Sequence, residues 1–226
     1  MYKQKHFIIR KKCMKNKELD QIFLESEGDK FFLRNGPRVN HSVFKAVKFI
    51  KPNAKTKILE IGCGCGSTLK KIKINFKSKV WGIDTSKKAI EYSKRKNKLK
   101  NTYNDKFLTF NKKNNFDIVI AGGFLYTTSN KKIEKSINKL IKLTKKNSYL
   151  IIWDYDTPFN YTNPYKHDKN VKSYKRNLLN LFHKSRRKLY LVSKYLCLKD
   201  GTKIKHFNNN TITDNIFAVM IFKKIR

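Results

Sequence analysis

The stretch KILEIGCGCG, residues 57–66, joins a short apolar run directly to a loop with three glycines. The apolar run has the length and composition of a buried strand. Gly62 and Gly64 carry no side chain, so the backbone of the loop can turn tightly and approach a bound molecule. The stretch therefore predicts a strand, a ligand-binding turn and a helix, in that order.

Two details of this loop narrow the choice of ligand. Glu60 stands just before the glycines, and a carboxylate there suits a cationic group, such as the amino group of a methionine moiety, but repels a pyrophosphate. The spacing Gly62-x-Gly64-x-Gly66 also differs from GxGxxG, the dinucleotide fingerprint. A glycine-rich loop alone suits NAD, FAD, S-adenosylmethionine or no ligand. These details make dinucleotide binding the less favoured alternative.

Asp84 ends a second apolar run, residues 79–83, about 20 residues after the loop. A carboxylate in that place can accept hydrogen bonds from both hydroxyls of a ribose. The alternative is that Asp84 only caps a helix that begins near Ser86. Ligands of open α/β sheets bind at the carboxyl ends of strands, so the ribose role is favoured.

Apolar runs alternate with amphipathic segments along most of the chain. Strands are expected at residues 57–61, 79–83, 101–103, 116–121 and 148–153, and helices at 67–76, 86–96 and 130–145. This alternation predicts an α/β fold, in which helices cover both faces of a parallel sheet. An irregular polar stretch (154–170) and a helix (171–184) come next. Strands at 189–198 and 215–223 then follow without a helix between them, so we expect them to be antiparallel.

Three strings resemble motifs I, II and IV of the class I S-adenosylmethionine-dependent methyltransferases: ILEIGCGCGSTLKKI, VWGIDTSKKAIEYSK and FDIVIAGGFLYTT. They stand in the order and spacing of that family over about residues 55–155. The resemblance implies a Rossmann-like, mostly parallel sheet of seven strands with one antiparallel strand near the C-terminus. It also implies S-adenosyl-L-methionine as cofactor and one methyltransferase domain over 18–226. A helical cap at about 18–51 and a basic tail at 1–17 complete the expected organisation.

The family resemblance also assigns residues to parts of the cofactor. The methionine part is expected at Glu60, Gly62, Cys63 and Gly64, the ribose at Asp84, the adenine at Thr85 and Asp105, and the mouth for methyl transfer at Gly122, Gly123 and Phe124. Tyr126 stands where many relatives carry His, so no role of that His is carried over to this chain.

A narrower resemblance lies outside these motifs. EGDKFFLRN, residues 27–35, resembles the opening of methylases associated with pseudaminic acid and other surface-sugar biosynthesis, and residues 153–155 and 174–178 look similar too. This resemblance implies that Arg34 and Asn35 lie over the cofactor. The alternative for Arg34 is a surface ion pair.

An acceptor that loses a proton needs a general base near the carboxyl ends of the fourth and fifth expected strands. The titratable groups there are Asp154, Tyr155, Asp156 and His167. His167 is the first candidate because imidazole titrates near neutrality, with Asp154 and Tyr155 as further catalytic candidates. Residues 154–169 are polar, aromatic and irregular, which is typical of a substrate-binding loop and also of an ordinary surface loop.

The formal charge of +37, from 53 Lys and Arg against 16 Asp and Glu, suggests a polyanionic partner. However, the excess is nearly all Lys, and Asn, Ile, Phe and Tyr are also abundant, so an AT-rich genome offers a competing and favoured explanation. We therefore expect a small-molecule or sugar acceptor, such as a surface-polysaccharide precursor linked to a nucleotide or a carrier. An RNA or DNA methyltransferase is the alternative, although no (D/N)PP(Y/F) motif follows the fourth strand. A catalytically inactive binding protein is a further alternative, which the intact Glu60 and Asp84 disfavour.

The remaining sequence features concern metals and location. Four cysteines form no CxxC pair and have no nearby His cluster, so no metal site is expected. No run approaches the ~20 apolar residues of a membrane span. Free thiols then fit a reducing cytoplasm.

Overall fold

The computed structural model describes residues 18–111, 115–204 and 216–226; the expected tail at 1–17 lies outside them. Seven strands of the described residues form one sheet in the order β3-β2-β1-β4-β5-β9-β8. The strands are β1 (Lys57–Ile61), β2 (Lys79–Asp84), β3 (Thr102–Asn104), β4 (Phe116–Gly122), β5 (Thr144–Tyr155), β8 (Leu189–Cys197) and β9 (Phe217–Lys224). Within this sheet β9 alone runs in the direction opposite to the other six strands. The expected mostly parallel sheet with one antiparallel strand near the C-terminus is confirmed.

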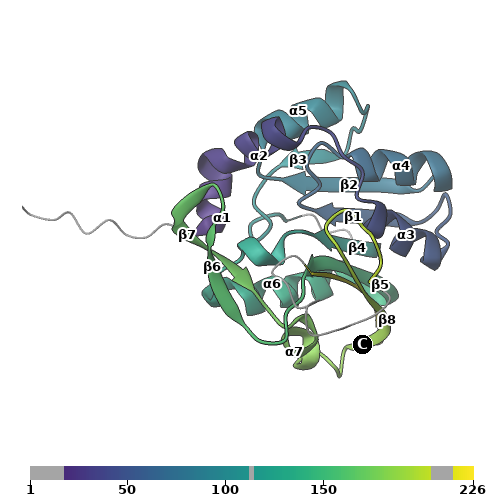
Figure 1. Ribbon diagram of the computed structural model, residues 1–226. Coiled ribbons are helices and arrows are strands. Elements are labelled where there is room, and N and C mark those ends of the chain that lie inside the picture. The colour runs from purple at the N-terminus through teal and green to yellow at the C-terminus, as the bar shows by residue number, and fades with distance from the viewer. Residues whose placement is uncertain (1–17, 112–114, 205–215) are drawn as a thin grey trace, which may run out of the picture.

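Helices pack on both faces of the sheet, as expected (Figure 1). One face carries α6 (Asn130–Leu143) and α7 (Leu178–His183), and the other carries α3 (His41–Ile50), α4 (Ser67–Phe76) and α5 (Lys87–Arg95). Successive side chains of β1 point to opposite faces of the sheet: Leu59 packs toward α6, and Ile58 packs toward α3. Both are fully buried, which explains the uninterrupted apolar runs of the central strands.

The chain after β5 differs from the expectation. Instead of an irregular stretch and a long helix, the structure has an antiparallel hairpin of β6 (Tyr161–Tyr165) and β7 (Asp168–Lys175), followed by the short α7. Val171, Ser173 and Lys175 are buried while their neighbours are more exposed, which is the alternation of a strand. Lys and Ser at two of these inward positions hide the apolar signal, so the predicted helix at 171–184 was wrong over its first part.

The chain before β1 forms a nearly continuous helical rod of α1 (Leu19–Ile22), the π-helical turn η1 (Phe23–Glu27) and α2 (Gly28–Asn35). Leu19 is fully buried against Tyr165 and Val171 of the hairpin. Figure 1 shows the hairpin beside α1 and α2 beside α5. The rod and the hairpin therefore stand together at the end of the sheet where the candidate site lies.

Candidate active site

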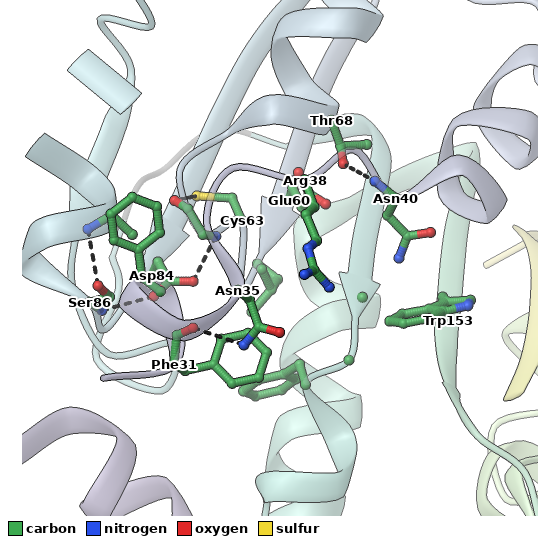
Figure 2. A pocket seen from close by; sticks show the side chains of 18 of the residues that line it. Phe31, Asn35, Arg38, Asn40, Glu60, Cys63, Thr68, Asp84, Ser86 and Trp153 are labelled. Atoms are coloured by element: carbon green, nitrogen blue, oxygen red, sulfur yellow. Dashed lines mark hydrogen bonds between the residues drawn. The ribbon is translucent and has the colours of Figure 1, made fainter. Parts of the chain in front are cut away.

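A cavity of about 840 Å³ opens at the carboxyl ends of β1, β2, β4 and β5 (Figure 2). The helical rod and the start of α3 also contribute to its wall. Gly28 lets the rod approach the turn after β2, because a Cβ there would lie 3.2 Å from the Thr85 hydroxyl and 3.3 Å from the Ser86 amide nitrogen. Asp29 fixes this approach by accepting hydrogen bonds from the Ser86 hydroxyl at 2.7 Å and the Lys88 amide at 3.0 Å.

The glycine loop has the backbone geometry that its sequence predicts. Gly62, Gly64 and Gly66 have φ angles of 70°, 53° and 72°, a region that side chains disfavour. The amide of Gly64 donates to the Asp84 carboxylate at 2.7 Å, and that carboxylate also accepts from the Ser86 amide at 2.8 Å. Asp84 thus ties the loop after β1 to the turn after β2 and lines the cavity, while Ser86 itself caps α5.

Glu60 is 5% exposed and lies in the cavity wall. Burial, with a smaller contribution from the negative charge of Asp84, raises the pKa of Glu60 to about 8. Its Oε2 atom has no hydrogen-bond partner among the described residues. An unsatisfied buried carboxyl is costly, and a bound ammonium group would satisfy it. The site therefore fits the amino end of a methionine moiety.

The cavity brings together eleven of the twelve residues expected to bind the cofactor. These are Asn35, Glu60, Gly62, Cys63, Gly64, Asp84, Thr85, Asp105, Gly122, Gly123 and Phe124. Arg34 is the exception, because it does not line the cavity and forms an ion pair with Glu27, the alternative considered for it.

Arg38 reaches the position that was expected for Arg34. Gly36, with φ of 61°, ends α2 and turns the chain back toward the sheet. Arg38 then lines the cavity, and Figure 2 shows its side chain extending into the middle of the space. No partner of its guanidinium occurs in the part of the chain that the structure describes. No local signal in the sequence distinguishes Arg38 from Arg34, because the difference depends on where the helix ends.

Aromatic side chains form the end of the cavity beyond Gly123. Trp153 and Phe217 are stacked with ring centroids 4.5 Å apart, and Tyr155 lies 4.2 Å from Phe217. Tyr126 packs edge-on against Tyr155 at 5.4 Å. All four line the cavity and together form what we call the aromatic wall. It lies past the methionine-binding end, at the place expected for an acceptor.

The rim of the cavity contains residues that the sequence did not single out. His41, at the start of α3, and Lys199, Asp200 and Gly201, in the turn after β8, all contribute to the wall. They are far apart in the sequence, and only the packing of that turn against α3 brings them together. The polar character of the turn was the only signal available beforehand.

The expected catalytic residues lie in different environments. Tyr155 lines the cavity, but His167 and Asp154 do not. His167 is exposed in the turn between β6 and β7, with its ring 5.5 Å from that of Tyr165. Asp154 is 1% exposed and accepts hydrogen bonds from backbone amides, and burial raises its pKa to about 6. Asp156, the remaining candidate, pairs with Lys194 at 2.6 Å and accepts from the Leu178 amide.

The described ranges contain neither a cluster of metal-ligating side chains nor a helix suited to crossing a membrane. No group of three or more His, Cys, Asp or Glu side chains there has a geometry that holds a metal ion. In the same part of the chain, no helix has both the length and the apolar character needed to cross a membrane.

Comparison with known proteins adds an independent observation. A family model described as a methyltransferase domain matches residues 52–211, which is most of the chain and includes the glycine loop, β4 and the aromatic residues of β5. A search of curated protein sequences found no significant match.

Several solved structures share the fold. The N-methyltransferase NodS from Bradyrhizobium japonicum, in complex with S-adenosylhomocysteine, is 16% identical over 92% of this chain and 97% of its own, with a TM-score of 0.61. A TehB-like S-adenosylmethionine-dependent methyltransferase from Corynebacterium glutamicum is 15% identical over 90% and 99%, with a TM-score of 0.61. The [4+2]-cyclase SpnF is 11% identical over 92% and 97%, with a TM-score of 0.65.

At these identities the structural likeness shows the fold, whereas the family match covers the glycine loop and the strand ends of the cavity, from Glu60 to Tyr155. Glu60, the glycine loop and Asp84 all lie within the matched residues and line this cavity. This chain therefore belongs to the methyltransferase domain family and is an S-adenosylmethionine-dependent methyltransferase.

Proposed function

We propose that the methyl acceptor is a small molecule that enters the cavity and rests against the aromatic wall. The observation that carries this proposal is the continuity of one cavity from the glycine loop to Trp153, Tyr155 and Phe217. Its volume of about 840 Å³ lies in the range of small-molecule sites. An acceptor in this position is enclosed by side chains, which suits a compact molecule better than an extended polymer.

Within this class we propose a sugar or a surface-polysaccharide precursor, linked to a nucleotide or a carrier. The string EGDKFFLRN supports it, and four members of that string, Gly28, Phe31, Phe32 and Asn35, line the cavity. The aromatic wall suits a ring, and Lys199 suits an anionic group attached to that ring.

The cofactor is proposed to lie along the wall from Arg38 to Asp105. Glu60 accepts the amino group of its methionine part, and Arg38, rather than Arg34, holds the carboxylate. Asp84 faces the ribose hydroxyls, and Thr85 and Asp105 lie beside the adenine. When bound, S-adenosylmethionine supplies a methyl group on a positively charged sulfur. The chain itself contributes alignment and exclusion of water.

Tyr155 is proposed to contact the acceptor directly, because it belongs to the aromatic wall. Asp154 and His167 do not reach the cavity, so we assign neither of them the role of base. His41 is proposed for that role when the acceptor must lose a proton, because it is the histidine in the cavity wall and imidazole is the commonest general base.

Calorimetry tests the cofactor assignment first. We expect the wild type to bind S-adenosylmethionine with a micromolar Kd, about −8 kcal/mol, and Asp84→Ala and Gly62→Val to lose binding. Transfer of a labelled methyl group to nucleotide sugars, other small metabolites and RNA then tests the acceptor class. Transfer to small molecules but not to sugars would remove the finer proposal. A folded wild type that binds no cofactor would contradict the assignment of the site.

A nucleic-acid acceptor is the second candidate, favoured by the formal charge of +37. Contacts with phosphates release counterions, so such binding weakens steeply as salt rises. Methyl transfer to RNA or DNA that persists at physiological salt would favour this candidate. Salt-sensitive binding without transfer would indicate incidental charge. SpnF shows that the fold also serves a cyclase, so transfer of the labelled group is the decisive readout.

A further inference from the structure

The turn after β4 brings Phe124 and Tyr126 into the end of the cavity that contains the aromatic wall, which we call the acceptor end. Phe124 precedes the short 3-10 turn η2 (Leu125–Thr127), and Tyr126 lies within it. Gly123, with φ of 66°, begins this segment and donates its amide to the Trp153 carbonyl at 2.6 Å. Phe124, the N-cap residue, provides no side-chain hydrogen bond to the turn. The Thr127 amide donates to the Phe124 carbonyl within the turn, but the amides of Leu125 and Tyr126 need acceptors from elsewhere.

Asp154 of β5 supplies the partner for the amide end of this turn. Its Oδ2 accepts from the amides of Leu125 at 2.6 Å and Tyr126 at 3.3 Å, and its Oδ1 accepts from the Tyr155 amide at 2.8 Å. One carboxylate thus connects η2 with Tyr155 of the aromatic wall.

Arg176, just after β7, supplies the partner for the carbonyl end. Its guanidinium donates to the carbonyls of Leu125 at 2.8 Å and Thr128 at 2.6 Å, and to Oδ1 of Asn130 at 2.9 Å. A carboxylate on the amide end and a guanidinium on the carbonyl end match the polarity of the turn.

Both side chains are almost fully buried, with 1% of Asp154 and 5% of Arg176 exposed, and neither lines the cavity. Burying two charges is expensive, and apolar side chains of similar size often fill such space at a lower free-energy cost. Stability alone therefore accounts poorly for this pair. What the pair does achieve is to fix η2 from both ends.

We propose that Asp154 and Arg176 form a clamp that positions η2, and with it Phe124 and Tyr126, against the methyl acceptor. The clamp acts on the acceptor end, because the cofactor end is held separately by the glycine loop and Asp84. Both are positioning residues that act through η2. The assignment of Tyr126 to the acceptor end rests on the proposed function, whereas the clamping of η2 does not.

The clamp is tested by 19F NMR on protein that contains 3-fluorotyrosine, with the Tyr126 resonance identified by its loss in Tyr126→Phe. Asp154→Asn and Arg176→Met should shift or broaden this resonance. Asp156→Asn and Lys224→Met are the matched controls. The Asp156 carboxylate accepts a hydrogen bond from the Leu178 amide, and the Lys224 ammonium donates to the carbonyls of Ile141 and Thr144. Neither side chain touches η2. The controls should leave the resonance in place.

Calorimetry with S-adenosylhomocysteine is run on Asp154→Asn and Arg176→Met. We expect Kd to change much less than kcat, because the glycine loop and Asp84 do not depend on the clamp. With an acceptor from the methyl-transfer screen, kcat should fall roughly 10- to 100-fold, as expected when reacting groups are misplaced by about 1 Å. The KM for the cofactor should not change. Arg176→Lys keeps the charge but not the planar fork, so its effect should be intermediate.

Two results would overturn the clamp: a Tyr126 resonance that keeps its wild-type position in Asp154→Asn and Arg176→Met, or an equal change in the two controls. Should those variants fail to fold, a wild-type resonance in Arg176→Lys would overturn it as well. A wild type that binds no cofactor contradicts the proposed function instead, and the Tyr126 resonance still decides whether η2 is clamped.

Discussion

At the scale of the single residue, Glu60 is distinctive because its carboxyl is buried and one of its oxygens has no hydrogen-bond partner among the described residues. A folded-state pKa of about 8, above the ordinary value of 4.5, means that the folded protein binds the proton more tightly than the unfolded chain. The resulting stability is fully present below the unfolded pKa and is lost as pH rises through about 8.

The first prediction follows from this loss of stability as pH rises. Without cofactor, the free energy of unfolding of the wild type should fall between about pH 5 and 8 more steeply than that of Glu60→Gln, which has no proton to lose. Urea unfolding at a series of pH values measures both curves. Parallel curves would show that Glu60 titrates normally in the folded protein.

The second prediction concerns the cofactor at the same residue. A bound ammonium favours the ionised carboxylate, so binding near pH 7 should release a proton from Glu60. The affinity for S-adenosylmethionine should then rise between about pH 6 and 7.5. Calorimetry in buffers of different ionisation enthalpy counts the protons released, and Glu60→Gln should release fewer. Equal proton release by the two proteins would contradict the assignment of Glu60 to the amino group.

The third prediction distinguishes the role of Arg34, within α2, from that of Arg38, just after α2. Arg38→Met should weaken S-adenosylhomocysteine binding by roughly 10- to 100-fold, since hydrogen bonds to a charged group contribute about 1.5–3 kcal/mol. Arg34→Met is the control, because Arg34 pairs with Glu27 outside the cavity wall. Equal losses in the two variants would mean that Arg38 has no special contact with the cofactor.

At the scale of the element, the loop between β1 and α4 contains two glycines with different surroundings. A Cβ at Gly66 would lie 2.6 Å from Leu99 Cδ1 and 2.8 Å from Ser93 Oγ, whereas a Cβ at Gly64 meets nothing within 4 Å. Gly66 therefore allows α4 to begin close to the end of α5. Gly64 leaves space beside the cavity for a ligand.

The fourth prediction is that Gly66→Ala and Gly64→Ala separate stability from binding. Both variants suffer the strain of a positive φ, about 1–2 kcal/mol, and Gly66→Ala adds the steric clash. Gly66→Ala should therefore unfold at the lower urea concentration, while Gly64→Ala should lose more cofactor affinity. Equal destabilisation by the two substitutions would show that packing against Leu99 and Ser93 adjusts freely.

At the scale of the whole molecule, the charge of +37 opposes the compact state through repulsion between like charges. Few acidic partners are available, because 16 Asp and Glu face 53 Lys and Arg. Some of these acids already form ion pairs: Asp117 pairs with Lys145, and Asp156 pairs with Lys194. Most basic side chains therefore depend on solvent ions for screening.

The fifth prediction is that Tm rises with sodium chloride from low salt to about 0.5 M and then levels off, because the screening length falls below ~10 Å above about 0.1 M. Differential scanning calorimetry measures the change, and potassium chloride should give the same curve because the effect is not ion-specific. A Tm that falls or stays constant over this range would show that the repulsion does not limit stability.

The sequence by itself determined the sheet, the helices on its two faces and the glycine loop. These features depend on local periodicity and on backbone conformations that only certain residues adopt, such as the positive φ of Gly62 and Gly64. Eleven of the twelve expected cofactor-binding residues lie at or just after strand ends, in the glycine loop or at the end of α2, and they line one cavity.

Only the tertiary structure decided the remainder. It showed the β6–β7 hairpin, whose inward positions include Ser173 and Lys175, and it brought Arg38 rather than Arg34 into the cavity. It also brought His41 together with Asp200, and it placed Asp154 and Arg176 on opposite ends of η2. Each of these arrangements depends on contacts between segments far apart in the chain. Such contacts are set by the packing of the whole domain and leave no periodic pattern in the local sequence.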